Sequence, residues 1–147
     1  MDSNIGQPIE ILIVEDNPGD IRLIQEILKE THLNNNIKVA KDGEVALKIL
    51  FNKENIYRPD LILLDLNLPK IDGRELLAKV KENEQLKCIP VVILTTSTAE
   101  EDIIETYKKH ANSYITKPMD LDQFIKVVES IKNFRLSIVK LPRSDEI

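Results

Sequence analysis

Short apolar runs alternate with longer amphipathic segments along this chain. Three of the short runs are almost wholly apolar, which is typical of strands that are covered on both faces of a parallel sheet. The strands that we predict from these runs are residues 10–15, 37–40, 61–65, 91–95 and 113–116.

The segments between the predicted strands carry apolar residues at helical spacing. The first helix is expected to begin at Asn17 and Pro18, because asparagine caps helices well and proline suits the first helical position. Five strand–helix units in succession predict one doubly wound α/β domain with a five-stranded parallel sheet. The later helices are expected to begin near Gly43 and after Gly73, Thr98 and Asp120.

Polar side chains stand at the ends of four of the predicted strands. Right-handed crossovers bring the carboxyl ends of parallel strands to one edge of the sheet, where such folds bind ligands, so we expect these side chains to lie together. They are Glu15 and Asp16 at the end of the first strand, Asp65 at the end of the third, Thr95 and Thr96 at the end of the fourth, and Lys117 after the fifth.

Three carboxylates at one point repel one another, and at least one pKa would rise if they were left alone. Mg²⁺ would offset this charge, because it prefers oxygen ligands and keeps positions for water or phosphate. With Lys117 added, the set suits the handling of a phosphoryl group. The chain has no GxxxxGK[ST] loop and only four glycines, so a nucleotide cradle is not expected. Asp65, on the central strand, is then the best candidate to form an acyl phosphate itself.

Each of these residues also has an ordinary interpretation. Asp16, with the Asn-Pro pair that follows it, could simply cap a helix, and Asp65 could be a turn residue. Lys117 alone could be a surface lysine, and Thr95 and Thr96 could be strand or cap residues. The functional interpretation depends on their joint placement at one edge of the sheet.

With these residues in view, the chain resembles the receiver domain of two-component response regulators, which accept a phosphoryl group from a histidine kinase. The resemblance covers roughly residues 9–134, which leaves 1–8 as a leader and 135–147 as a C-terminal tail. It implies a flavodoxin-like fold with strand order 2-1-3-4-5 and a signalling switch rather than an enzyme. The segments that carry it are ILIVEDNP (11–18), PDLILLDLNLPKIDG (59–73), PVVILTTS (90–97) and YITKP (114–118).

The resemblance implies a role for each residue at this edge. Asp65 would be the phosphorylated aspartate. Glu15 and Asp16 would be the acidic pair, with Asp16 a direct ligand of Mg²⁺. Asn67 would offer its backbone carbonyl to the metal, and Lys117 would pair with the phosphate.

The resemblance also implies how the signal leaves the site. Thr95, followed by Thr96, would be the switch hydroxyl that moves to the phosphoryl group, and Tyr114 would be the aromatic side chain that moves with it. The bond between Lys117 and Pro118 would be cis, which proline tolerates at little cost.

Signalling would change the surface formed by the fourth helix, the last strand and the fifth helix, and so control a partner protein or the chain's own dimerisation. Ile103 and Tyr107 are spaced i, i+4, so both could lie on this surface beside Tyr114. Packing of Ile103 and Tyr107 in the core is an equally open alternative.

The chain's ending suggests a subgroup. Residues 134–142, together with the long segment 51–58 before the third strand, are similar to small standalone regulators that serve bacterial phytochrome kinases. This likeness implies a phytochrome-type histidine kinase as partner and a homodimer through the signalling surface, with a contribution from the tail. The downstream protein is not indicated.

The amino-acid composition limits the kinds of partner and the cellular compartment that we expect for this chain. Twenty basic and 25 acidic residues give a net charge of −5, which argues against nucleic acid or an anionic membrane as partner. The lone Cys88 allows no internal disulfide, and no apolar run or leader predicts a membrane span or secretion, so a cytoplasmic protein is expected. A single domain of 147 residues has no room for an output module, so it would act by docking.

Three rival functions remain. A phosphatase with an aspartate nucleophile would normally need a second acid two residues after Asp65, where this chain has Asn67. A flavodoxin-like binding module would need a phosphate loop after the first strand, where Glu15 and Asp16 would repel phosphate. A receiver that signals by protein contacts alone, without phosphate, is the third.

Overall fold

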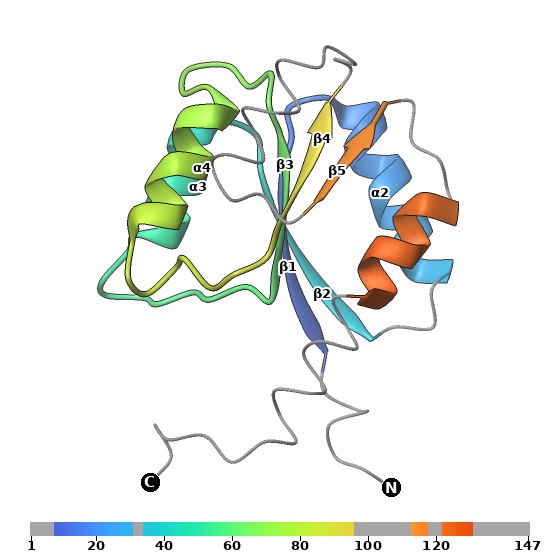
Figure 1. The fold of residues 1–147 in the computed structure, drawn as a ribbon, viewed down its shortest axis with the longest axis horizontal. Helices are drawn as coiled ribbons and strands as arrows, with labels where there is room; N and C mark the ends of the chain where they lie inside the picture. Colours follow the sequence, from blue (N-terminus) through green and yellow to red (C-terminus); the bar gives the residue numbers. More distant parts are fainter. Residues whose placement is uncertain (1–7, 31–33, 96–112, 118–121, 131–147) are drawn as a thin grey trace, which may run out of the picture.

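The computed structural model describes residues 8–30, 34–95, 113–117 and 122–130 (Figure 1). Several of the residues singled out from the sequence lie outside these ranges, as do nearly all of the leader and the whole tail. They are Thr96, Ile103, Tyr107 and Pro118.

The described strands form a five-stranded sheet in the order β2-β1-β3-β4-β5, and every neighbouring pair is parallel. The predicted topology is therefore confirmed. β2 begins two residues earlier than the apolar pattern predicts. The strand bounds are β1 (Ile9–Val14), β2 (Asn35–Ala40), β3 (Leu61–Asp65), β4 (Val91–Thr95) and β5 (Ser113–Thr116).

Four helices are described, and their starting points follow the signals in the sequence. Asp42 and Asp72 cap two of them, each accepting a hydrogen bond from a backbone N–H of the first turn, at 2.8 Å from Val45 and 2.7 Å from Arg74. The helices are α2 (Pro18–Glu30), α3 (Gly43–Leu50), α4 (Gly73–Glu82) and residues 122–130.

The helices cover the two faces of the sheet in pairs (Figure 1). Side chains of α3 and α4 pack with Leu12 and Val14 of β1 in one cluster. Side chains of α2 and of helix 122–130 pack with Ile11 and Ile13 of the same strand in the other. This explains why the central strands read as continuous apolar runs, since both faces of each strand are buried.

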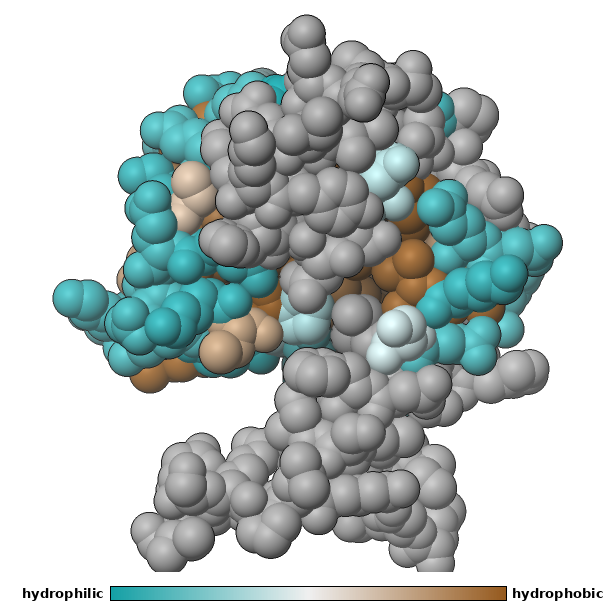
Figure 2. Space-filling view, viewed as in Figure 1, coloured by the Kyte–Doolittle hydropathy of each residue, from teal (hydrophilic) through white to brown (hydrophobic). Residues whose placement is uncertain are grey.

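Polar residues cover the outer sides of both helical layers, and hydrophobic residues show between the layers (Figure 2). Within the described residues, no helix is both long and apolar enough to cross a membrane. Most buried apolar side chains thus lie in the two clusters that hold the helices to the sheet, and the site residues at the carboxyl edge of the sheet are polar.

Candidate functional site

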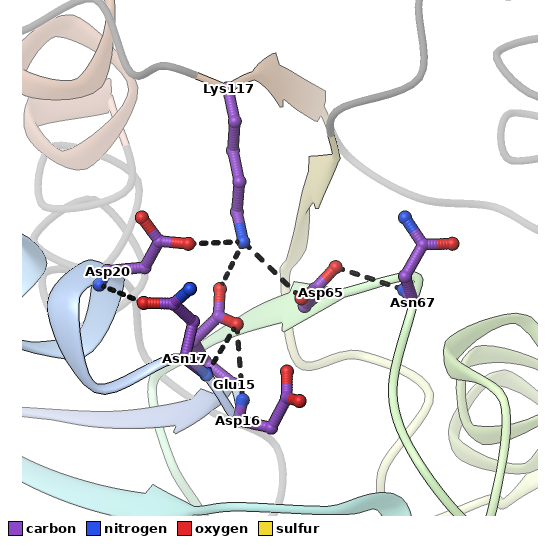
Figure 3. Close-up of polar contacts among 7 residues, drawn as sticks. All are labelled: Glu15, Asp16, Asn17, Asp20, Asp65, Asn67 and Lys117. Atoms are coloured by element: carbon purple, nitrogen blue, oxygen red, sulfur yellow. Dashed lines mark hydrogen bonds and ion pairs between the residues drawn. The ribbon is translucent and has the colours of Figure 1, made fainter.

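The carboxyl edge of the sheet brings together the acidic residues and the lysine that the sequence singles out (Figure 3). Glu15 and Asp16 directly follow β1, Asp65 ends β3, and Lys117 directly follows β5. One carboxylate oxygen from each of Glu15, Asp16 and Asp65 lies within 4.8 Å of the other two. The parallel register explains why these residues meet. Val14 of β1 pairs with Leu64 of β3, so the next residues, Glu15 and Asp65, lie at the same level of the sheet.

Glu15 is the inner member of the cluster and is completely buried. Its Oε2 accepts hydrogen bonds from the backbone N–H groups of Asp16 (3.1 Å) and Asn17 (3.2 Å), and its Oε1 accepts one from Lys117 Nζ (2.5 Å). Burial raises the pKa of Glu15 to about 7, against the pull of Lys117, and the nearby charge of Asp65 adds to the rise. Burial thus makes this carboxyl group hold a proton at a higher pH than an exposed glutamate does.

Asp65 is also buried, at 5% exposure. Its Oδ1 accepts a hydrogen bond from the backbone N–H of Asn67 (3.0 Å), and its Oδ2 lies 3.3 Å from Lys117 Nζ. These two contacts fix the orientation of the carboxylate at the end of β3. Asn67 thus joins the site through its backbone.

Gly73, the first residue of α4, allows the chain to pass directly against Asp65. A Cβ atom there would collide with the carbonyl oxygen of Asp65 and would lie 2.7 Å from Cα of Leu66. The backbone N–H of Gly73 instead donates to the carbonyl of Leu66 (3.1 Å). The absence of a side chain therefore lets α4 begin against the end of β3, where the candidate acceptor Asp65 lies.

Lys117 is held by three carboxylates, from Glu15 (2.5 Å), Asp20 (2.8 Å) and Asp65 (3.3 Å), and its side chain is only 10% exposed. Burial by itself would lower the pKa of Lys117, but the hydrogen bonds to Asp20 and Glu15 outweigh it and raise the pKa above its usual value. The ammonium is therefore charged throughout the physiological range.

Asp20 is the site residue that sequence reasoning missed. It lies in the first turn of α2 and not at a strand end, so the rule that located the other residues could not find it. The available signal was an acidic residue one turn after the Asn-Pro helix start, which reads equally well as a partner of the helix dipole.

The other predicted switch residues are placed only in part. Tyr114 lies on β5, half-buried, against the cluster that includes α3 and α4. Thr95 is the last residue of β4, and its backbone is in register with that of Thr116. Its side chain is not among those that the structure describes. The roles given to Thr95 and Tyr114 thus stay predictions.

The three acidic residues fit a hard divalent cation. Carboxylate oxygens are the ligands that Mg²⁺ and similar cations prefer, and the exposed Asp16 leaves one side of the cluster open to water. Among the residues that the structure describes, the cluster contains carboxylates and no histidine or cysteine, so these residues offer a soft metal no preferred ligand. What the arrangement offers chemically is a buried carboxylate flanked by an ammonium and by a cation site.

The amino-acid sequence matches the family model of the response regulator receiver domain over residues 11–129. It is 47% identical over 145 residues to response regulator Rcp1 of Synechocystis, an alignment that covers 97% of this chain and 99% of that protein.

Two solved structures are similar to this chain in both fold and sequence. The Mn²⁺-bound form of response regulator Rcp1 has a TM-score of 0.76 at 48% identity, covering 92% of this chain and 100% of that one. The phosphorylated cyanobacterial phytochrome response regulator RcpA has a TM-score of 0.76 at 47% identity, covering 93% and 100%.

Proposed function

This chain belongs to the family of response regulator receiver domains, and we propose that Asp65 is the residue that accepts its phosphoryl group. The family works in two-component signalling, where a histidine kinase supplies the phosphoryl group. The observation that carries the proposal is the buried Asp65 carboxylate, oriented by the backbone of Asn67 and lying 3.3 Å from Lys117 Nζ.

The cation in the proposal is Mg²⁺, held by the carboxylates of Glu15, Asp16 and Asp65, with Asp16 as a direct ligand and the backbone carbonyl of Asn67 as a further one. The acidic cluster supports a divalent cation at this place, and the similar protein Rcp1 has a Mn²⁺-bound form. When bound, the cation supplies positive charge that offsets the charge on the transferring phosphoryl group.

The chain's own residues carry the transfer. A carboxylate oxygen of Asp65 attacks the phosphorus of a phosphohistidine or a small acyl phosphate, a new P–O bond forms, and the bond to the donor nitrogen or oxygen breaks with its electron pair leaving on the donor. Lys117 donates to the phosphoryl oxygens, and its raised pKa keeps it charged for this task. The buried setting strengthens this interaction.

The signal would then pass from the phosphorylated site to the surface around β5. Thr95, with Thr96 beside it, moves to the phosphoryl group, Tyr114 follows, and the surface of β5, helix 122–130 and the segment with Ile103 and Tyr107 changes. A phosphoryl group adds charge and acceptors that bias a two-state element in this way. Tyr114 is half-buried on β5, so its side chain already contacts both the core cluster and solvent, as this role requires.

The partners are proposed from the relatives. Two solved structures similar to this chain, a cyanobacterial phytochrome response regulator and a bacteriophytochrome response regulator, support a phytochrome-type histidine kinase as the donor. Homodimerisation through the signalling surface, with the tail taking part, and a downstream protein that reads the same surface are further proposals. We place the chain in the cytoplasm, where a soluble kinase domain would meet it.

Phosphorylation with acetyl phosphate and Mg²⁺ tests the assignment of Asp65. The wild-type protein should gain one phosphoryl group by intact-mass measurement, and Asp65→Asn should gain none. Asp60→Asn is a matched control, because Asp60 lies next to the opposite end of the same strand and accepts a hydrogen bond from the Glu10 N–H (2.8 Å). Uptake by Asp65→Asn at the wild-type level would show that the acceptor is another residue.

A further inference from the structure

Asp20 makes a contact at the site that the transfer step itself does not require. Its Oδ2 lies 2.8 Å from Lys117 Nζ, nearer than the 3.3 Å that separates the same nitrogen from Asp65. A protonated lysine has three N–H donors, and in this structure each faces one carboxylate. Figure 3 shows the ammonium between Asp20 on one side and Asp65 on the other, with Glu15 beside it.

The three partners of Lys117 differ in their relation to the cation site. Glu15 and Asp65 belong to the acidic cluster whose oxygens come within 4.8 Å of one another, and Asp20 does not. Lys117 therefore shares two of its three acceptors with the proposed cation. An ammonium that moved fully onto those two carboxylates would neutralise them and compete with the cation for the same oxygens.

Asp20 is fixed firmly enough to oppose this movement. Its backbone N–H donates to Oδ1 of Asn17 (3.0 Å), so the first turn of α2 is capped at this residue. Two residues of the same helix, Ile24 and Leu28, are buried in the cluster that includes Ile11 and Ile13 of β1. The carboxylate of Asp20 thus comes from a packed helix, on the side of Lys117 away from Asp65.

We propose that Asp20 is a positioning residue that holds the ammonium of Lys117 at the outer edge of the acidic cluster, so that the cluster can accept a divalent cation and the ammonium together. This inference rests on the proposed function of Asp65 and its cation site. The carboxylate of Asp20 belongs to neither the phosphoryl acceptor nor the cation site, so it stays a partner of Lys117 before and after phosphorylation.

Mn²⁺ binding, followed by electron paramagnetic resonance of the free ion, tests the proposal without any phosphoryl transfer. Asp20→Ala should weaken Mn²⁺ binding by roughly three- to tenfold, the size expected for coupling within one ion-pair network. Lys117→Ala should bind Mn²⁺ at least as tightly as the wild type. Adding Asp20→Ala to Lys117→Ala should then change the affinity less than about twofold, because Asp20 acts through the lysine.

Two variants guard against other causes. Asp20→Asn keeps an acceptor for Lys117 and the shape of the helix start, so its affinity should lie between those of the wild type and Asp20→Ala. Glu44→Ala removes an acidic residue from the first turn of α3, where it pairs with Lys48 (3.8 Å), and should leave Mn²⁺ binding unchanged. A thermal melt of each variant confirms that it is folded.

The outcomes separate this inference from the function on which it rests. Wild-type affinity in Asp20→Ala would overturn the positioning role. An equal loss of affinity with and without Lys117 would also overturn it, because the effect would then be one of net charge alone. Failure of the wild-type protein to bind Mn²⁺ would instead overturn the cation site, and with it the proposed function.

Discussion

The carboxylate of Glu15 and the ammonium of Lys117 lie 2.5 Å apart, although 102 residues separate them along the chain. Each sits one residue beyond a strand, β1 and β5, on opposite sides of the central strand β3. The pair therefore closes over Asp65 from both sides.

Lys117→Ala should retain cation binding but lose most phosphoryl transfer. The lysine donates to the group that carries the developing charge, and loss of one such positioned donor costs about 10²-fold or more in rate. The measurement is the rate of acetyl phosphate turnover onto the protein at saturating Mg²⁺. Lys48→Ala, which removes an exposed lysine from α3, is the control and should react at the wild-type rate. A Lys117→Ala rate within twofold of wild type would contradict the role of the lysine.

The stability of the cation-free protein should depend on pH through Glu15. Its pKa is raised from 4.5 to about 7 in the folded protein, chiefly by burial, so the folded state binds this proton more tightly than the unfolded chain does. The contribution of Glu15 to the free energy of unfolding is full below pH 4.5 and is lost as the pH rises through about 7.

Urea unfolding in a chelator, for the wild type and for Glu15→Gln, measures this contribution. The neutral amide cannot titrate, so the difference between the two proteins should change by on the order of 2 kcal/mol across that interval. Parallel pH profiles for the two proteins would show that Glu15 has an ordinary pKa.

Mg²⁺ should stabilise the folded protein, and more strongly above neutral pH than in mild acid. A ligand that binds only the folded state raises the free energy of unfolding by about 2.7 kcal/mol at about 100 times its dissociation constant. Protons compete with the cation for Glu15, whose pKa is raised to about 7, so the gain should shrink as the pH falls below that value. Thermal unfolding with and without Mg²⁺ at several pH values is the measurement, and an equal gain at every pH would contradict this coupling.

Gly73→Ala should destabilise the protein and disturb Asp65. The added Cβ would collide with the backbone of Asp65 and Leu66, and overpacking of this kind costs about 1–3 kcal/mol. Gly19→Ala is the control, because a Cβ there would meet only Asn17 Oδ1, at 3.1 Å, on a side chain that can shift. Urea unfolding compares them, and similar losses for both variants would show that the contact at Gly73 is not special.

Tyr57→Phe should cost little or no stability. The hydroxyl of Tyr57 is buried with no hydrogen-bond partner among the described residues, and burial raises its pKa to about 12, so it is neutral. Removing an unpaired buried polar atom relieves a desolvation cost of about 1 kcal/mol or more. The Lys38 ammonium, 5.0 Å from the ring centroid, keeps its aromatic partner in phenylalanine. A loss above about 1 kcal/mol in urea unfolding would mean that the hydroxyl is hydrogen-bonded in solution.

The sheet contains both strands that the sequence predicted well and residues that it missed. The central strands β1 and β3 were predictable because both faces of each are buried, so that all but Glu10 and Asp65 of their residues are apolar. The first two residues of β2, Asn35 and Asn36, were missed. β2 lies at the edge of the sheet, and Asn36 hydrogen-bonds Glu10 through its side chain (2.9 Å), so pairing there does not depend on apolar side chains.

The resemblance to receiver domains implied the order of the strands, whereas the sequence pattern by itself determined that Glu15, Asp16, Asp65 and Lys117 gather at one edge. It did so because parallel topology sends every strand end to the same place. Only the tertiary structure decided which carboxylate lies nearest to Lys117, and that Asp20 of α2 is among them. The periodicity of the strands does not indicate whether the first turn of α2 lies close enough to Lys117 for Asp20 to contact it. The position of α2 depends on how Ile24 and Leu28 pack against β1, so packing, and not pattern, places Asp20 at the site.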